Sequence, residues 1–180
     1  ICGDHEGGTV CVNGHFDRPD KCAPARLRIV GEQIPYDESL VGGLAERYRR
    51  MVEPFGLDVP LGAIVELNRP SCEGGAPAPW TWSADVVFSH ARLRHDRLSF
   101  PLENAGATLH VTNERIERLS LEAEVGGTPV RAEGSVFFFE EGRHHGFYTA
   151  GIEGADLSTD LMTLLPTTAM EAIQTLHPSG

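Results

Sequence analysis

The chain has 180 residues, of which 41% are hydrophobic and 23% charged, and this composition is typical of a folded globular protein. Its 15 Lys and Arg residues against 26 Asp and Glu residues give a formal net charge of −11. This balance argues against a nucleic-acid-binding protein and against electrostatic docking on anionic lipid headgroups, because both need clustered cations. No apolar run reaches the roughly 18 residues that a membrane-spanning helix needs.

The chain does not begin with Met, and we expect it to be a piece of a longer protein. None of its cysteines forms a C-x-x-C pair, which argues against a zinc knuckle or a thioredoxin-like motif. An even number allows two disulfides in an oxidising compartment, with three possible connectivities. We favour the interpretation that the cysteines are small buried or half-buried apolar side chains, because a chain of this length does not need disulfides for stability. The cysteines are Cys2, Cys11, Cys22 and Cys72.

The first third of the chain contains short alternating runs and one helical pattern. Asp37 can cap a helix, and Leu40, Leu44 and Tyr48 follow at helical spacing, which predicts a helix over 37–53. The expected strands on either side lie within 10–16, 27–29 and 59–67.

Beyond residue 80, period-two alternation of apolar and polar residues is the strongest local signal. Turn residues such as Gly126-Gly127 separate the runs, and the connections are too short for crossover helices. The pattern therefore predicts a mainly β fold with short helices, an antiparallel meander with one apolar face and one polar face. The alternating runs are 80–88, 107–111, 119–125, 130–138 and 148–152.

Two parts of the chain are similar to each other at a spacing of about 120 residues, which is the signature of a repeat protein. Gly7-Gly8 matches Gly126-Gly127, and Leu40 and Leu44 match Leu161 and Leu165 in a second helical pattern. We therefore predict an elongated sheet built from repeats. The predicted division is 1–56, the end of one repeat with the helix 37–53, and 57–180, a second repeat with strands in 58–156 and a helical segment in 158–176.

The segments 119–134 (L-S-L-E-A-E-V-G-G-T-P-V-R-A-E-G) and 155–166 (A-D-L-S-T-D-L-M-T-L-L-P) resemble the AsmA-like and TamB-like bacterial envelope proteins, a family of bridge-like lipid transfer repeats. The resemblance implies a curved antiparallel sheet with an apolar concave face that conducts phospholipid acyl chains. It also implies a location in the periplasm, a parent protein anchored in the inner membrane, a part in outer-membrane biogenesis and neighbouring repeats of the same chain as partners.

The alternation alone also supports a groove, because five strands present more apolar surface than two short helices can cover. The alternative is that the sheet folds over into a sandwich, as in an extracellular interaction module stabilised by disulfides. On the groove hypothesis the partner is a phospholipid or another acyl lipid, with no cofactor and no nucleic acid. The residues predicted to bind lipid are Trp82, Val86, Phe88, Leu109, Val111, Leu119, Leu121, Val130, Val136 and Phe138.

The clusters of polar residues in the sequence give little support to a catalytic function. A third hypothesis is a metal-dependent hydrolase that uses Asp4, His5 and His15, but their spacing matches no known ligand motif. The chain has no G-x-S-x-G motif, phosphate-binding loop or dinucleotide fingerprint. We therefore predict a protein that is not an enzyme and that has no catalytic or metal site. Phe137 is expected to point away from the apolar face, against a helix or another part of the parent protein.

Overall fold

The computed structural model describes residues 1–5, 7–16, 22–72, 76, 78–96, 100–138 and 144–152. Strands make up most of this part, as the alternation predicts. They are β1 (Cys2–His5), β2 (Gly8–Phe16), β3 (Ala25–Ile34), β4 (Phe55–Leu57), β5 (Leu61–Arg69), β6 (Thr81–His95), β7 (Leu102–Thr112), β8 (Arg115–Val125), β9 (Thr128–Phe138) and β10 (His144–Ile152).

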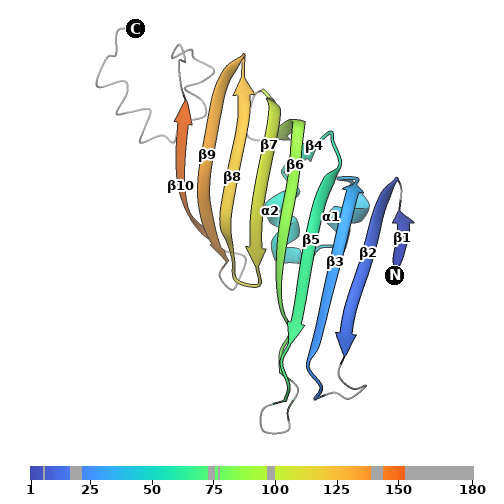
Figure 1. Cartoon of the computed structure of the whole chain (residues 1–180). Helices are drawn as coiled ribbons and strands as arrows, with labels where there is room; N and C mark the ends of the chain where they lie inside the picture. The colour runs from blue at the N-terminus through green and yellow to red at the C-terminus, as the bar shows by residue number, and fades with distance from the viewer. Residues whose placement is uncertain are drawn as a thin grey trace.

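The ten strands form one open antiparallel sheet in the order β1-β2-β3-β5-β6-β7-β8-β9-β10 (Figure 1). The short strand β4 pairs with the far end of β6, where β5 no longer reaches. The predicted mainly β fold with an antiparallel meander is confirmed. The described residues form a single sheet and not the two packed sheets of a sandwich.

Two helices, α1 (Glu38–Gly43) and α2 (Glu46–Val52), lie on one side of the sheet (Figure 1). As predicted, Asp37 caps the first: its Oδ1 accepts a hydrogen bond from the Leu40 N–H at 2.9 Å. The prediction of one continuous helix over 37–53 is wrong, because Leu44 has extended backbone angles that end α1. Two glycines at the end of α1 weaken it, so the chain leaves the helix there.

The strand register decides which side chains share a face, because directly paired residues point to the same side of a sheet. Val86 pairs with Leu109, and the neighbouring residue Asp85 pairs with His110. The Tyr48 ring of α2 contacts Trp82, which lies on the same face as Val86. We call this side the helix-bearing face, and the side of Asp85 and His110 the open face.

Two irregularities keep the alternation in phase on the long strands. His90 in β6 and Asn104 in β7 have φ angles of 56° and 49°, and the pairing shifts beside each of them. After the shift, Ala91 pairs with Ala105 and both are buried. Without such a bulge, one extra residue in a strand would place all the following side chains on the opposite face of the sheet. β6 therefore continues past this bulge to His95.

A cluster of buried side chains lies at the end of the helix-bearing face nearest the β8–β9 turn. In the described part of the chain, no large side chain is fully buried. Leu57 at the end of β4 packs against the cluster, as do Val59 and Phe100 from the connections between strands. We call this group the buried cluster; it consists of Ala91, Leu93, Leu102, Ala105, Ala123 and Val125.

The pairing of the first hairpin recurs in a later one. Each pair of β1–β2 has a counterpart in β8–β9 that lies 120 positions further along in both strands. The pairs of β2–β3 recur in β9–β10, where the β2 residue is shifted by 120 positions and the β3 residue by 121. β10 is therefore the counterpart of β3. Cys2↔Cys11, Gly3↔Val10, Asp4↔Thr9 and His5↔Gly8 correspond to Glu122↔Arg131, Ala123↔Val130, Glu124↔Pro129 and Val125↔Thr128.

This correspondence fits the predicted repeat, but the division into 1–56 and 57–180 stays a prediction. The helical segment predicted over 158–176 lies outside the described residues, which end at Ile152.

Candidate functional site

The residues predicted to bind lipid lie on four neighbouring strands, β6 to β9. Val86 pairs with Leu109 and Leu109 pairs with Leu119, so three strands contribute one continuous row of apolar side chains. The register assigns the other predicted residues to the same helix-bearing face. For Phe138 this refers to its position in β9 alone, since its side chain is outside the described part.

Part of this face is covered by the protein itself at the Trp82 end. The Tyr48 and Trp82 rings meet edge to face, with centroids 5.4 Å apart. The Tyr48 hydroxyl donates to the Asn113 carbonyl, and the Asn113 Oδ1 accepts from the Trp82 N–H at 2.7 Å. These contacts fix α2 against the turn between β7 and β8. Tyr36 donates to the Val52 carbonyl, and burial raises the pKa of the Tyr36 phenol.

The other end of the predicted site belongs to the protein's own packing. Phe88, Leu121 and Val130 pack against the buried cluster. Val136 pairs with Ile116 near the β7–β8 turn, at the Trp82 end, and is only 3% exposed. These four side chains therefore contribute to stability before any ligand arrives. What is left between the two covered ends is a half-buried group that we call the central apolar strip: Val86, Leu109, Val111 and Leu119.

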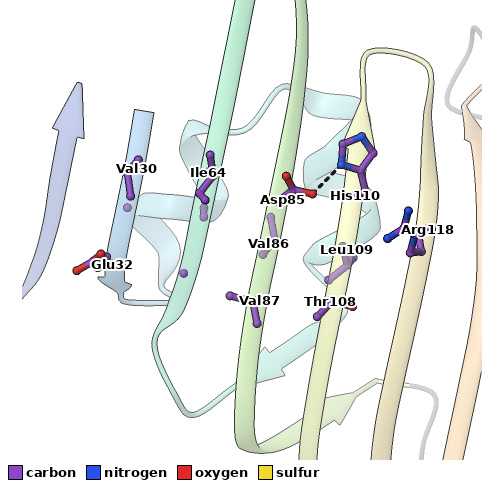
Figure 2. Close-up of a pocket in the computed structure, with 13 residues that line it drawn as sticks. Val30, Glu32, Ile64, Asp85, Val86, Val87, Thr108, Leu109, His110 and Arg118 are labelled. Carbon is purple, nitrogen blue, oxygen red and sulfur yellow. Dashed lines mark hydrogen bonds and ion pairs between the residues drawn. The ribbon is translucent and has the colours of Figure 1, made fainter. Parts of the chain in front are cut away.

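The open face carries a hollow that the sequence analysis missed. It has a volume of about 380 Å³ and crosses the strands from β3 to β8 (Figure 2). Val30, Ile64 and Val87 give it an apolar floor, and Val87 is 49% exposed. A signal was present in the sequence, because neighbouring apolar residues such as Val86 and Val87 place apolar side chains on both faces of one strand.

A histidine on the rim of this hollow is held between two carboxylates. The His110 Nδ1 lies 2.7 Å from the Asp85 Oδ1, and Figure 2 marks this contact with a dashed line. Its Nε2 lies 3.8 Å from the Glu117 Oε2. The three side chains come from β6, β7 and β8 and link those strands on the open face. Both imidazole nitrogens thus face carboxylates and neither faces a nucleophile, so the arrangement links side chains of three strands.

The cysteines are not unpaired apolar side chains, and that prediction is wrong. Cys2 is bonded to Cys11 across β1 and β2, and Cys22 is bonded to Cys72, which joins the chain before β3 to the chain after β5. Pairing at separations of 9 and 50 residues follows from the sheet register, which sequence spacing alone does not reveal.

The residues of the metal hypothesis do not come together. Asp4 pairs with Thr9, and its carboxylate accepts a hydrogen bond from the Thr9 hydroxyl. His15 lies further along β2, about 20 Å from Thr9 at the rise of a β-strand. Within the described ranges, no group of three or more His, Cys, Asp or Glu side chains is placed to hold a metal ion.

Phe137 lies on the face opposite the helix-bearing face, as predicted from its position in the alternation. It is half-buried on the open face, where the Arg115 guanidinium lies 5.4 Å from the centre of its ring. It pairs with His145, whose ring meets Phe147 edge to face at 4.9 Å.

The fold and disulfides define the described part of the chain as an open antiparallel β-sheet with two cross-links. No family model, no curated protein and no solved structure matches it. In the part of the chain that the structure describes, neither helix is long and apolar enough to cross a membrane.

Proposed function

We propose that this chain is a non-enzymatic segment that holds or conducts acyl chains of a phospholipid or similar lipid along the helix-bearing face. The observation that carries the proposal is the central apolar strip. Val86, Leu109 and Leu119 form one row across three strands and stay half-buried on the face where the helices pack. Covering each methylene of such a surface gains roughly 0.8 kcal/mol, so a hydrocarbon chain is a favourable occupant.

The proposed setting is an oxidising compartment, namely the periplasm, in a longer protein anchored in the inner membrane and similar to AsmA-like and TamB-like proteins. Two disulfides support a location outside the reducing cytosol. The same observation favours a second candidate, an extracellular interaction module whose single sheet is stabilised by disulfides. The two candidates differ in whether the helix-bearing face binds lipid.

Mass spectrometry of the purified chain under native conditions tests the proposal, because it detects lipid that co-purifies. We expect phospholipid on the wild-type chain and much less on Leu109→Asn, which places an amide in the central apolar strip. Thr108→Asn is the matched control, since Thr108 is the preceding residue of the same strand and is exposed on the open face. Retention of lipid by both variants alike, or no lipid on the wild-type chain, would contradict the proposal and favour the interaction module.

A further inference from the structure

The two edges of the sheet are built differently. β1 has four residues, carries Asp4 and is bonded to β2 through Cys2–Cys11. β10 has nine residues and contains no Pro, Lys, Asp or Glu. Short strands, charges and prolines are the devices with which proteins protect an edge from pairing with another strand. β10 lacks all of them, and its Phe147 is 63% exposed.

No strand of the described residues pairs with the outer edge of β10. Its counterpart, β3, shows what such an edge accepts. β3 has β2 on one side and β5 on the other, and it pairs with β5 in antiparallel register from Ala25↔Arg69 to Gly31↔Ala63. Since β2–β3 and β9–β10 have equivalent pairings, the outer edge of β10 presents the backbone arrangement that β3 presents to β5.

We propose that the outer edge of β10 is an interaction surface that binds an extended, antiparallel segment of β5-like chemistry supplied by a partner. Such a segment has small or branched apolar residues at alternate positions, as in the β5 sequence L-G-A-I-V-E-L-N-R. Main-chain hydrogen bonds supply the affinity in this mode of recognition, and alternate side chains supply the specificity. The surface does not depend on lipid binding, because it is the edge of the sheet and not its apolar face.

The register also indicates which amide groups of β10 serve the partner. A two-residue turn closes β8–β9 at the pair Val125↔Thr128, and hydrogen-bonded and non-hydrogen-bonded pairs then alternate along an antiparallel ladder. Continued to β10, this alternation directs the N–H of Thr149 toward β9 and the N–H of Ala150 outward. Ala150 corresponds to Ile29 of β3, which pairs with Val65 of β5.

A synthetic peptide of the β5 sequence, added to the full chain, tests this proposal by hydrogen–deuterium exchange. We expect slower amide exchange confined to residues 144–152. A peptide N-methylated at the positions of Val65 and Leu67, which face β10 in the β3-like register, is expected to lose this effect. The matched control peptide carries the methyl groups at the positions of Ile64 and Glu66, which face the other way, and is expected to retain it.

Protein variants give a second test. Ala150→Pro removes the outward N–H and is expected to abolish the slower exchange, whereas Ala150→Val keeps the N–H and the effect. If Ala150→Pro does not fold, the methylated peptides still decide the question on the unaltered chain. Equal effects of the two methylated peptides would overturn the proposal. So would altered exchange in β3 or β6, which indicates displacement of β5, or full protection of the outward β10 amides before peptide is added.

Discussion

The two ends of the sheet are held together in different ways. Near the β8–β9 turn, the ends of β6 and β8 and the start of β7 bury the small apolar side chains of the buried cluster, in which Ala91 faces Ala105 and Leu93 faces Leu102. At the opposite end, β3 and β5 are joined by the Cys22–Cys72 disulfide.

Next to the covalent bond of the disulfide end, the buried apolar side chains are the small ones of Ala23 and Ala25. The Arg69 guanidinium lies 5.1 Å from the centre of the Trp80 ring and donates to the Ala23 carbonyl, while Trp80 itself is 37% exposed. A single-layer sheet has only a limited capacity to bury side chains. The difference indicates that hydrophobic burial alone stabilises one end, whereas a cross-link adds to the burial of Ala23 and Ala25 at the other, with the proposed lipid-binding strip between them.

The largest expected effect comes from the disulfide end. Replacing Cys22 and Cys72 by Ser frees a loop of 50 residues and is expected to lower the free energy of unfolding by about 4 kcal/mol. Urea denaturation followed by circular dichroism measures the change. The matched control is Cys2→Ser with Cys11→Ser, which opens a separation of 9 residues beside the exposed strand β1 and should cost less. Equal losses in the two double variants would contradict the assignment of the cross-linked end.

At the other end, Leu93→Ala removes a side chain that is only 8% exposed and is expected to cost about 3 kcal/mol of unfolding free energy. Leu119→Ala, on the half-buried central apolar strip, is expected to cost about 1 kcal/mol. Thermal and chemical denaturation of lipid-free protein compares them. A larger loss for Leu119 than for Leu93 would show that the strip, and not the buried cluster, is the main core.

The contact between α2 and the sheet is expected to make a smaller contribution. Tyr48→Phe removes the hydroxyl that donates to the Asn113 carbonyl, at a cost of about 1 kcal/mol. Amide exchange should then rise in residues 46–52 and at the β7–β8 turn. Tyr36→Phe also loses one hydrogen bond to a carbonyl, but that carbonyl belongs to Val52 in α2, so the turn should be unaffected. A turn that opens equally in both variants would argue against this anchor.

The smallest effect is expected on the open face, between the two ends. Asp85→Asn alters an ion pair whose carboxylate is 67% exposed, so the free energy of unfolding should change by about 0.5 kcal/mol or less. Repeating the denaturation at high salt should leave wild type and variant even closer together. A loss of several kcal/mol would mean that the Asp85–His110–Glu117 linkage holds the middle of the sheet together.

Much of the sheet follows from alternation alone. The run 80–88 begins one residue before β6, and the runs 107–111, 119–125 and 130–138 fall within β7, β8 and β9. That Val86, Leu109 and Leu119 share a face could be predicted, because a period-two pattern is read directly from sequence. The residues at which the strands end are harder to predict from sequence. β6 continues past the strained residue His90, and a bulge of this kind has no simple pattern.

The candidate site could be predicted only in part, because side chains on one face can have different neighbours. Leu109 and Val136 have the same place in the alternation, yet Leu109 is half-buried and Val136 is 3% exposed. Which of them is covered depends on the path of α2 and of the connections around Leu57 and Phe100, which are tertiary contacts. The disulfides were missed for the same reason, since Cys22 and Cys72 meet only when β3 pairs with β5.

The neighbour-to-neighbour order of the strands has a consequence for how the chain folds. Apart from the passage from β3 through the helices to β5, each strand pairs with the strand that follows it directly in the chain. Contacts between residues that are near each other in sequence form quickly, because little chain entropy is lost before each pair forms. The sheet can therefore grow hairpin by hairpin, from the N-terminal side as synthesis proceeds, with every finished strand serving as the template for the next.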